Sequence, residues 1–318
     1  MRRFFQPLQD LSEKYNILQT AMASSERIFT LLDTVPTVPD NANEVGVLRN
    51  KGGVEVVFED VWFAYDLAHM AKHTPGAEQE RAPVEWVLKG VSFTARPGET
   101  LALVGHTGAG KTTIVNLLMR FYDPQRGRIT INGVDIRTMP LQELRSLIGY
   151  VQQDIFLFAG DIASNIRLSS PISDEAVARA AAEVGADRII RGFPLGYGQV
   201  LGERGASISV GERQLLSFAR AIAANAPLLL LDEATSAVDS EIEAEIHAAL
   251  SVLVAGRTTI AVAHRLSTIA NADMILVLHH GEVAERGTHS ELIQRGGLYS
   301  TLWRLQAGES ESLLQRAG

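Results

Sequence analysis

The chain has 318 residues, 46% of them hydrophobic, which is enough for one large domain or two smaller ones. Its net charge is −8 and no lysine or arginine block stands out, so the composition does not suggest a nucleic-acid partner. The absence of cysteine excludes disulfides and thiolate metal sites, and no apolar run reaches the roughly 18 residues of a membrane-spanning helix.

The N-terminal region carries a helical pattern. Apolar residues recur at alternating steps of three and four from Pro7 to Leu32, which predicts one amphipathic helix. The following stretch contains Pro36 and Pro39 and indicates a linker, with a domain boundary near residue 45. The pattern leaves two interpretations open: a surface helix packed on the same domain, or the severed end of something longer.

The pattern then changes to alternating segments that are rich in β-formers. They predict strands over 54–58, 61–65, 87–94 and 100–104, which form an antiparallel opening followed by a β-loop-α unit. The stretch between Asp66 and Trp86 has no sustained period and is interpreted as a hairpin insertion. Its two histidines, His69 and His73, are expected in a solvated loop with no metal role.

The second half of the chain alternates between helix and strand patterns. Start and stop signals predict a helix over residues 173–185, inside a helical insert. Strands are predicted at 228–231, 258–262 and 274–278, with helices around 241–254 and 289–305 between and after them. This alternation is typical of a parallel sheet covered by helices, so the predicted fold class is α/β.

Residues 105–112, called the glycine loop below, read Gly-His-Thr-Gly-Ala-Gly-Lys-Thr and lie between a predicted strand and the apolar helix Ile114 to Phe121. Glycines let successive backbone N–H groups curve around phosphate oxygens, and a helix N-terminus adds positive potential. Lys111 would reach the β- and γ-phosphates, and the Thr112 hydroxyl would be a ligand of Mg²⁺. A chance match to the pattern is the alternative.

Two acids and one histidine follow predicted strands. Asp232 and Glu233 end a run of four leucines, which predicts a buried strand that presents two carboxylates at the carboxyl edge of the sheet. Asp232 would hold magnesium through water, and Glu233 would orient or deprotonate an attacking water. The alternative is that these acids only solvate a strand end. His264 could contact the γ-phosphate, although an isolated histidine is more often a satisfied core residue.

A further helix start lies at Ser209. The apolar face formed by Leu215, Leu216, Ala219 and Ile222 predicts a helix that follows it, so Ser209 is predicted to be the N-cap. Such a helix N-terminus carries positive potential and suits an anion. A simple capping role is the alternative.

These motifs together resemble the nucleotide-binding domain of ATP-binding-cassette exporters, from about Leu8 to Leu305. The resemblance implies a P-loop NTPase-type parallel sheet flanked by helices, with an antiparallel β subdomain, an α-helical subdomain over about 153–224 and an N-terminal amphipathic helix. It also implies that the chain has four regions. Residues 1–34 would be a helical extension from a missing transmembrane domain, residues 35–50 a linker, residues 51–307 the ATP-binding domain and residues 308–318 a flexible tail.

The resemblance assigns roles to individual residues. The Walker A loop would bind ATP through Gly105, Thr107, Gly108, Ala109, Gly110, Lys111, Thr112 and Thr113. Gln153 would be the Q-loop glutamine, acting in catalysis with Glu233 and His264 and in metal binding with Thr112 and Asp232. Tyr65 would stack on adenine, although a lone aromatic at that spacing is otherwise more often a core residue. Ser209 and Gly211 of the signature and Asp239 of the D-loop would also contact ATP.

The implied activity is ATP hydrolysis that drives export across a membrane through a head-to-tail dimer of two cassettes. The implied cofactors are ATP and Mg²⁺, and the implied partners are a second cassette and the transmembrane domain of an exporter. The intact transporter would place this part at the cytoplasmic face of the cell membrane, and the fragment itself would be soluble. Residues 156–162 and 202–205 resemble exporter segments that meet the membrane domain.

Two other functional classes compete with an exporter ATPase. A regulatory nucleotide-binding cassette with little hydrolysis would be favoured by an altered Glu233 or His264, and neither is altered. Cassette ATPases of DNA repair or chromosome structure carry long coiled coils, for which the gap between Gln153 and Ser209 leaves no room.

The signature departs from the usual Leu-Ser-Gly-Gly-Gln at Ile208, Val210 and Glu212. A β-branched side chain at Val210 would block the close approach of backbone to phosphate that glycine allows. An acid in the first turn suits the helix dipole but repels phosphate. We therefore hypothesise an asymmetric heterodimer, in which this chain supplies the Walker motifs of the competent site and the weakened signature of the other site.

Overall fold

The computed structural model describes residues 2–36, 38–40, 53–66, 84–168, 171–202, 208–232, 240–262 and 270–305. The chain divides into two compact units, Met1–Pro39 and Asp40–Gly318. Among the described residues, no helix combines the length and apolar content needed to span a bilayer. The predicted hairpin insertion after Asp66, with His69 and His73, and the predicted tail over 308–318 lie outside the described residues.

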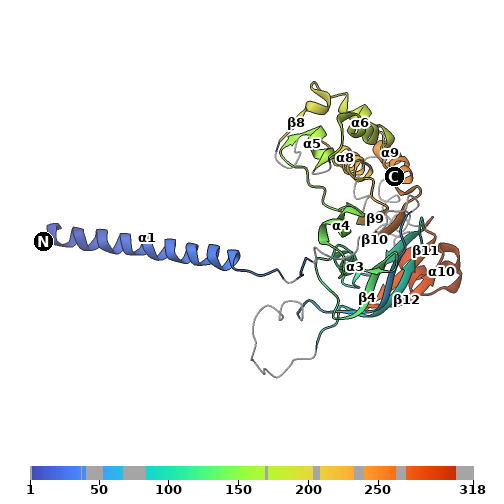
Figure 1. The fold of residues 1–318 in the computed structure, drawn as a ribbon, viewed down its shortest axis with the longest axis horizontal. Coiled ribbons are helices and arrows are strands. Elements are labelled where there is room, and N and C mark those ends of the chain that lie inside the picture. Colours follow the sequence, from blue (N-terminus) through green and yellow to red (C-terminus); the bar gives the residue numbers. More distant parts are fainter. Residues whose placement is uncertain are drawn as a thin grey trace, which may run out of the picture. The chain divides into compact units, whose positions relative to one another are not determined.

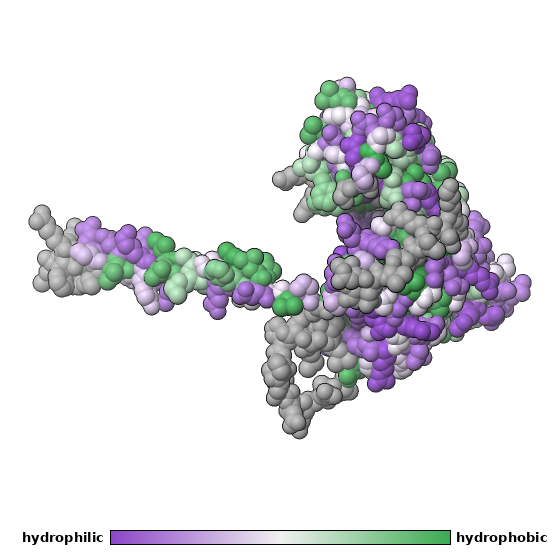
Figure 2. Space-filling model, in the orientation of Figure 1, coloured by the Kyte–Doolittle hydropathy of each residue, from purple (hydrophilic) through white to green (hydrophobic). Residues whose placement is uncertain are grey.

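The first unit contains helix α1 (Arg2–Leu32), drawn in blue in Figure 1. It contains the whole predicted helix and begins a few residues earlier. Its apolar side chains are more than half exposed, namely Leu11, Tyr15, Leu18, Met22, Phe29 and Leu32. Both hydrophobic and hydrophilic residues lie on the side of α1 that Figure 2 shows.

The second unit is built around a six-stranded sheet with the order β12-β11-β3-β10-β9-β6 (Figure 1). The strands are β3 (Thr100–Val104), β6 (Ile148–Val151), β9 (Leu228–Asp232), β10 (Thr258–Val262), β11 (Met274–His279) and β12 (Glu282–Gly287). All neighbours are parallel except β11 and β12, which form an antiparallel hairpin. The predicted parallel sheet and its later strands are confirmed, and the edge strand β12 is an addition.

A four-stranded antiparallel sheet has the order β2-β1-β4-β5. It comprises β1 (Val56–Phe63), β2 (Leu88–Ala95), β4 (Arg126–Ile131) and β5 (Val134–Asp135). The prediction of two strands over 54–58 and 61–65 is wrong, because a single strand, β1, runs from Val56 to Phe63 across both. The register of β1 shifts against both neighbours around Asp60, whose φ is 46°. This bulge resets the alternation of buried and exposed residues, so one strand has the pattern of two.

Helices cover the sheets and form a separate layer. They are α3 (Lys111–Leu118), α4 (Leu141–Ser146), α5 (Ile162–Arg167), α6 (Asp174–Glu183), α7 (Ala186–Ile190), α8 (Val210–Ala223), α9 (Ser240–Val254) and α10 (His289–Arg295). In Figure 1, α5, α6 and α8 gather at the top of the second unit with β8 (Val200–Leu201), which pairs with β7 (Gly160–Asp161). This group has its own apolar cluster.

Two predicted helices differ in their bounds for local reasons. The helix predicted over 289–305 is interrupted, because Gly296 takes φ 67° and ends α10; residues 298–305 are helical again. The helix predicted over Ile114 to Phe121 is α3, which begins at Lys111 because Gly110 is its N-cap. Lys111 therefore lies in the first turn of a helix whose apolar face is buried in the main core.

Candidate functional site

The candidate site lies at the carboxyl ends of three parallel strands. The glycine loop follows β3, Asp232 ends β9, and Gln153 follows β6. Val262 of β10 is the register partner of both Leu103 and Asp232, so two strand spacings, or about 10 Å, separate Asp232 from the end of β3. The parallel sheet thus collects segments that are far apart in the chain at one edge, where ligands of open α/β sheets bind.

The glycine loop is pressed against β11 at its first residue. A Cβ on Gly105 would lie 2.4 Å from the carbonyl oxygen of Leu278, so no side chain fits there. Gly108 has φ 82°, which favours glycine, and a Cβ there would meet nothing within 4 Å. The loop therefore has a closed side toward β11 and an open side at Gly108, where a ligand can approach the backbone.

Lys111 is folded into the centre of the glycine loop. Its side chain is buried, and its Nζ donates to the carbonyl oxygen of Gly105 at 2.7 Å and to that of His106 at 3.1 Å. Thr112, the next residue, is exposed in the first turn of α3. An ammonium group, the N–H groups of a helix start and an accessible hydroxyl thus come from consecutive residues, an arrangement that suits a phosphate group.

Tyr65 lies two residues beyond the end of β1 and is held against α3. Its hydroxyl lies 3.1 Å from Oγ1 of Thr113 and accepts a hydrogen bond from Nδ2 of Asn116 at 3.2 Å. Its ring makes edge-on contacts with Phe63 and Tyr122. Tyr65 is half-buried, so part of the ring packs on the core while the residue remains within reach of the start of α3. Thr113 is buried and its hydroxyl faces Tyr65. Any contact between Thr113 and a ligand would therefore use the backbone N–H of Thr113.

Asp232 has a neighbour that the sequence pattern did not single out. The Tyr150 hydroxyl of β6 donates to Oδ2 of Asp232 at 3.4 Å. Burial raises the pKa of Tyr150 to about 12, with further contributions from the charge and hydrogen bond of Asp232. Tyr150 therefore stays a donor at neutral pH. Only the pairing of β6 with β9 brings the two side chains together, so no local signal could have identified Tyr150.

Ser209 occupies the N-cap of α8, as predicted. It forms a capping box with Glu212, and the Ser209 side chain is exposed. Gly211 is buried, whereas Val210, the first residue of α8, is 44% exposed. Helix α8 packs against α5, α6, α7 and α9, so this segment belongs to the helical group rather than to the glycine loop.

The predicted site is only partly described. The glycine loop, Tyr65, Thr113, Gln153, Asp232, Ser209 and Gly211 all lie in described segments. Gln153 is exposed, two residues beyond the end of β6. Glu233, Asp239 and His264 lie outside the described residues. Of the described set, the structure brings the loop, Thr113 and Tyr65 into one group and places Asp232 at the same sheet edge.

Comparisons with known proteins agree with this geometry. Residues 88–236 match the family model described as ABC transporter. The chain is 45% identical over 304 residues to the uncharacterized ABC transporter ATP-binding protein YknV of Bacillus subtilis (strain 168), which covers 95% of this chain and 47% of that protein. It is 42% identical over 302 residues to the ATP-dependent lipid A-core flippase of Methylobacillus flagellatus, which covers 94% of this chain and 48% of that protein.

A solved structure is similar over the same range. A bacterial Atm1-family ABC exporter with ATP bound has a TM-score of 0.77 and 39% sequence identity, and the match covers 95% of this chain and 50% of that one. The chain therefore spans about half the length of the relatives it matches.

Proposed function

The chain belongs to the ABC transporter family of ATP-binding domains, which hydrolyse ATP, and we propose that it is the motor domain of an exporter. The observation that carries the proposal is the glycine loop, with Lys111 held at its centre by the carbonyl groups of Gly105 and His106. ATP phosphates would take the place of these carbonyls as partners of the ammonium group. The N–H groups of the loop and of the first turn of α3 would receive the remaining phosphate oxygens.

The nucleotide base would lie at Tyr65. Tyr65 is half-buried, and its hydroxyl contacts Thr113 and Asn116. These contacts set the orientation of the ring before a ligand binds. A pre-oriented aromatic ring favours stacking, because little side-chain entropy is lost on binding.

The residues at the sheet edge fit a magnesium ion. Thr112 offers an exposed hydroxyl, Asp232 a half-buried carboxylate and Gln153 an exposed amide oxygen, and Mg²⁺ prefers oxygen ligands. Mg²⁺ would neutralise the charge that develops on the phosphate oxygens. Tyr150 would orient the Asp232 carboxylate through its hydrogen bond.

The hydrolysis step is assigned to Glu233, which directly follows Asp232 in the chain. A water oxygen would attack the γ-phosphorus, its proton would pass to the Glu233 carboxylate, and the bond to the β-phosphate oxygen would break to leave ADP. His264 and Gln153 would contact the γ-phosphate and the water. These roles rest on the family motif, since Glu233 and His264 lie outside the described residues.

The proposed dimer follows from the position of Ser209. Its side-chain oxygen accepts the Glu212 N–H in the capping box, which leaves the hydroxyl hydrogen able to donate to an anion. The residue is exposed at the start of α8, as a contact to a second cassette requires. Ser209 and Gly211, with Asp239, would therefore act on ATP held by a partner's glycine loop, and the heterodimer remains our hypothesis.

The remaining parts of the proposal concern the membrane. Relatives of about twice the length include an exporter and a flippase. Helix α1 would be the part of this chain that continues into a membrane domain. The proposed regions are then 1–34 for this extension, 35–50 for the linker and 51–307 for the ATP-binding domain. The intact protein would then carry this domain at the cytoplasmic face of the membrane and export a drug-like or lipid-like molecule.

The experiment measures ATP binding and Mg²⁺-dependent ATP hydrolysis by the chain together with a candidate partner cassette. Glu233→Gln should retain ATP binding and lose about 10²- to 10⁴-fold in turnover, the range expected for a general base. Lys111→Ala should lose ATP binding, and Glu282→Gln, on the exposed face of β12, should change neither. An unchanged rate in Glu233→Gln contradicts its role as base. Binding without turnover in the unaltered chain, with any partner, favours a regulatory cassette instead.

A further inference from the structure

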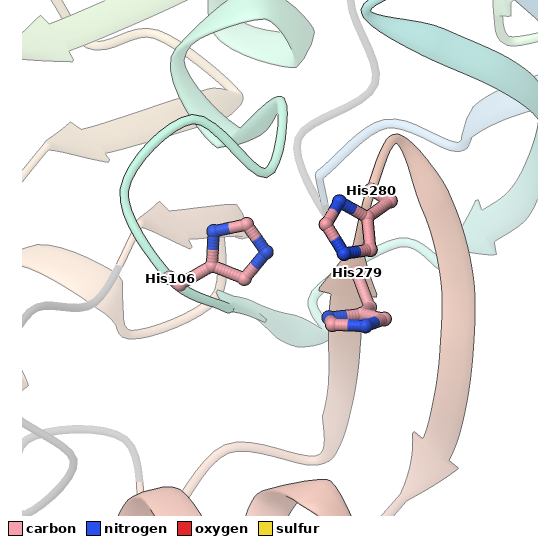
Figure 3. A group of neighbouring side chains, drawn as sticks. All are labelled: His106, His279 and His280. Atoms are coloured by element: carbon pink, nitrogen blue, oxygen red, sulfur yellow. The ribbon is translucent and has the colours of Figure 1, made fainter.

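Three histidines that the proposed function does not use gather beside the glycine loop (Figure 3). His106 is the second residue of the loop, His279 is the last residue of β11, and His280 begins the turn to β12. One ring nitrogen from each of the three lies within 4.8 Å of the other two. In Figure 3 the His106 ring extends from its loop toward the two rings on the turn.

The backbone fixes this arrangement independently of the histidine side chains. The contact between Gly105 and the Leu278 carbonyl places the start of the loop beside the end of β11. His280 and Gly281 have φ values of 48° and 84°, as in a type I′ hairpin turn. A Cβ on Gly281 would lie 2.3 Å from the carbonyl oxygen of Val87, the residue before β2. The turn is therefore also in close contact with the start of β2.

The tautomer of His106 suits a metal ligand. Its Nδ1 lies 2.7 Å from the carbonyl oxygen of Thr107, and because a carbonyl oxygen only accepts, the hydrogen must be on Nδ1. In the neutral ring Nε2 then carries a lone pair. Metal-binding histidines commonly donate their second ring N–H to a backbone carbonyl, which sets the tautomer and orients the ring.

The spacing of the rings leaves room for an ion. The His279 and His280 ring centroids are 4.2 Å apart, and each lies 5.4 Å from that of His106; none of the pairs is stacked. A tetrahedral Zn²⁺ with Zn–N bonds of about 2.0–2.1 Å needs nitrogens about 3.4 Å apart. His280 is exposed and can rotate to close the remaining gap while His106 keeps its bond to Thr107.

We propose that His106, His279 and His280 bind a divalent transition-metal ion, Zn²⁺ in the simplest case, which ties the glycine loop to the β11–β12 turn. Three imidazole nitrogens select such an ion over Mg²⁺ or Ca²⁺, which prefer oxygen. Three protein ligands leave a fourth position for water. This site is separate from the oxygen ligands proposed for the magnesium that accompanies ATP.

The test measures Zn²⁺ binding to the tag-free chain without nucleotide, by competition with a chromophoric chelator. Wild type should bind one Zn²⁺, and excess Mg²⁺ should not displace it. His106→Gln, His279→Gln and His280→Asn should each weaken binding at least about tenfold, because even loss of an outer-shell partner costs about 10- to 100-fold. Asparagine is chosen at position 280 because it tolerates a positive φ. His247→Gln, an exposed histidine on α9, is the matched control and should bind as wild type does.

Thermal unfolding provides a second readout. Zn²⁺ should raise the unfolding temperature of wild type and of His247→Gln, and this rise should vanish in the three cluster variants, whose unfolding without Zn²⁺ shows whether they fold. Zn²⁺ affinity that is equal in wild type and in a variant lacking all three histidines overturns the proposal. Since no nucleotide is present, this outcome is independent of whether the chain hydrolyses ATP.

Discussion

Ser209 and Glu212 bond each other twice at the start of α8. The Glu212 backbone N–H donates to Oγ of Ser209 at 3.2 Å, and the Ser209 backbone N–H donates to the Glu212 carboxylate at 2.7 Å. This reciprocal pair satisfies two backbone donors that the first turn of a helix would otherwise leave without partners. Glu212 is one of the departures from the usual signature, and the structure gives it a local role as the second half of a capping box.

The first prediction concerns this pair. Glu212→Ala should lower the free energy of unfolding by about 1 kcal/mol, because one backbone donor loses its partner and the first turn loses an acid. Glu212→Gln should stay close to wild type, since glutamine forms the same box. Urea unfolding of the chain measures both. Equal destabilisation by the two substitutions would show that charge, rather than capping, is what Glu212 contributes.

The second prediction concerns Val210, which is the first residue of α8 and is 44% exposed. If its side chain holds a partner's phosphate away from the helix start, Val210→Gly should raise ATP turnover of the isolated chain by on the order of tenfold, or about 1.4 kcal/mol of barrier. Val210→Ile, which keeps the β-branch, is the matched control and should not. Strong ATP hydrolysis by the unaltered chain alone, without a partner cassette, would contradict the heterodimer hypothesis.

The third prediction concerns the Tyr150–Asp232 hydrogen bond. Tyr150→Phe keeps the ring in the core but removes the hydroxyl donor. The Mg²⁺ concentration for half-maximal hydrolysis should therefore rise by about a few-fold. The rise should be small because a hydrogen bond of 3.4 Å is long and weak. Tyr197→Phe removes a tyrosine–aspartate bond of 2.7 Å, to Asp187 in the helical group, and serves as control. If both variants respond equally to Mg²⁺, Tyr150 does not orient Asp232.

The fourth prediction separates two roles of Tyr65. If its ring stacks on adenine, Tyr65→Phe should bind ATP about as well as wild type, whereas Tyr65→Ala should lose about 1–3 kcal/mol of ATP affinity, as for other base–aromatic contacts. Affinity for tripolyphosphate, which has no base, should be the same in all three proteins. A core role would instead lower the stability of Tyr65→Ala and reduce affinity for both ligands alike.

Much of the fold could be predicted because its signals are local. The strand predicted over 258–262 matches β10, and Ser209 caps α8 as its position before an apolar face indicated. The errors are local as well. The bulge at Asp60 divided one strand into two apparent strands, and the positive φ of Gly296 ended a helix that the apolar pattern continued. In both cases one residue's backbone conformation overrode the periodicity.

The candidate site also contains some parts that local sequence could predict and others that it could not. The glycine loop could be predicted because the groups proposed to bind phosphate come from eight consecutive residues, 105–112, and depend on glycines and a helix start. Tyr150 could not, because its contact with Asp232 requires that β6 lie beside β9. The histidine cluster could not, because it requires that the loop after β3 touch the end of β11.

Short-range patterns in the chain were enough to predict the glycine loop, the N-cap at Ser209 and the alternation of strands and helices that puts Asp232 at a strand end. These features depend on hydrogen bonds and backbone angles among neighbours in the chain. The tertiary structure alone decided which side chains from distant strands meet, notably Tyr150 with Asp232 and His106 with His279 and His280. Strand order and the close approach at Gly105 are set by packing of the whole sheet, which no short segment encodes.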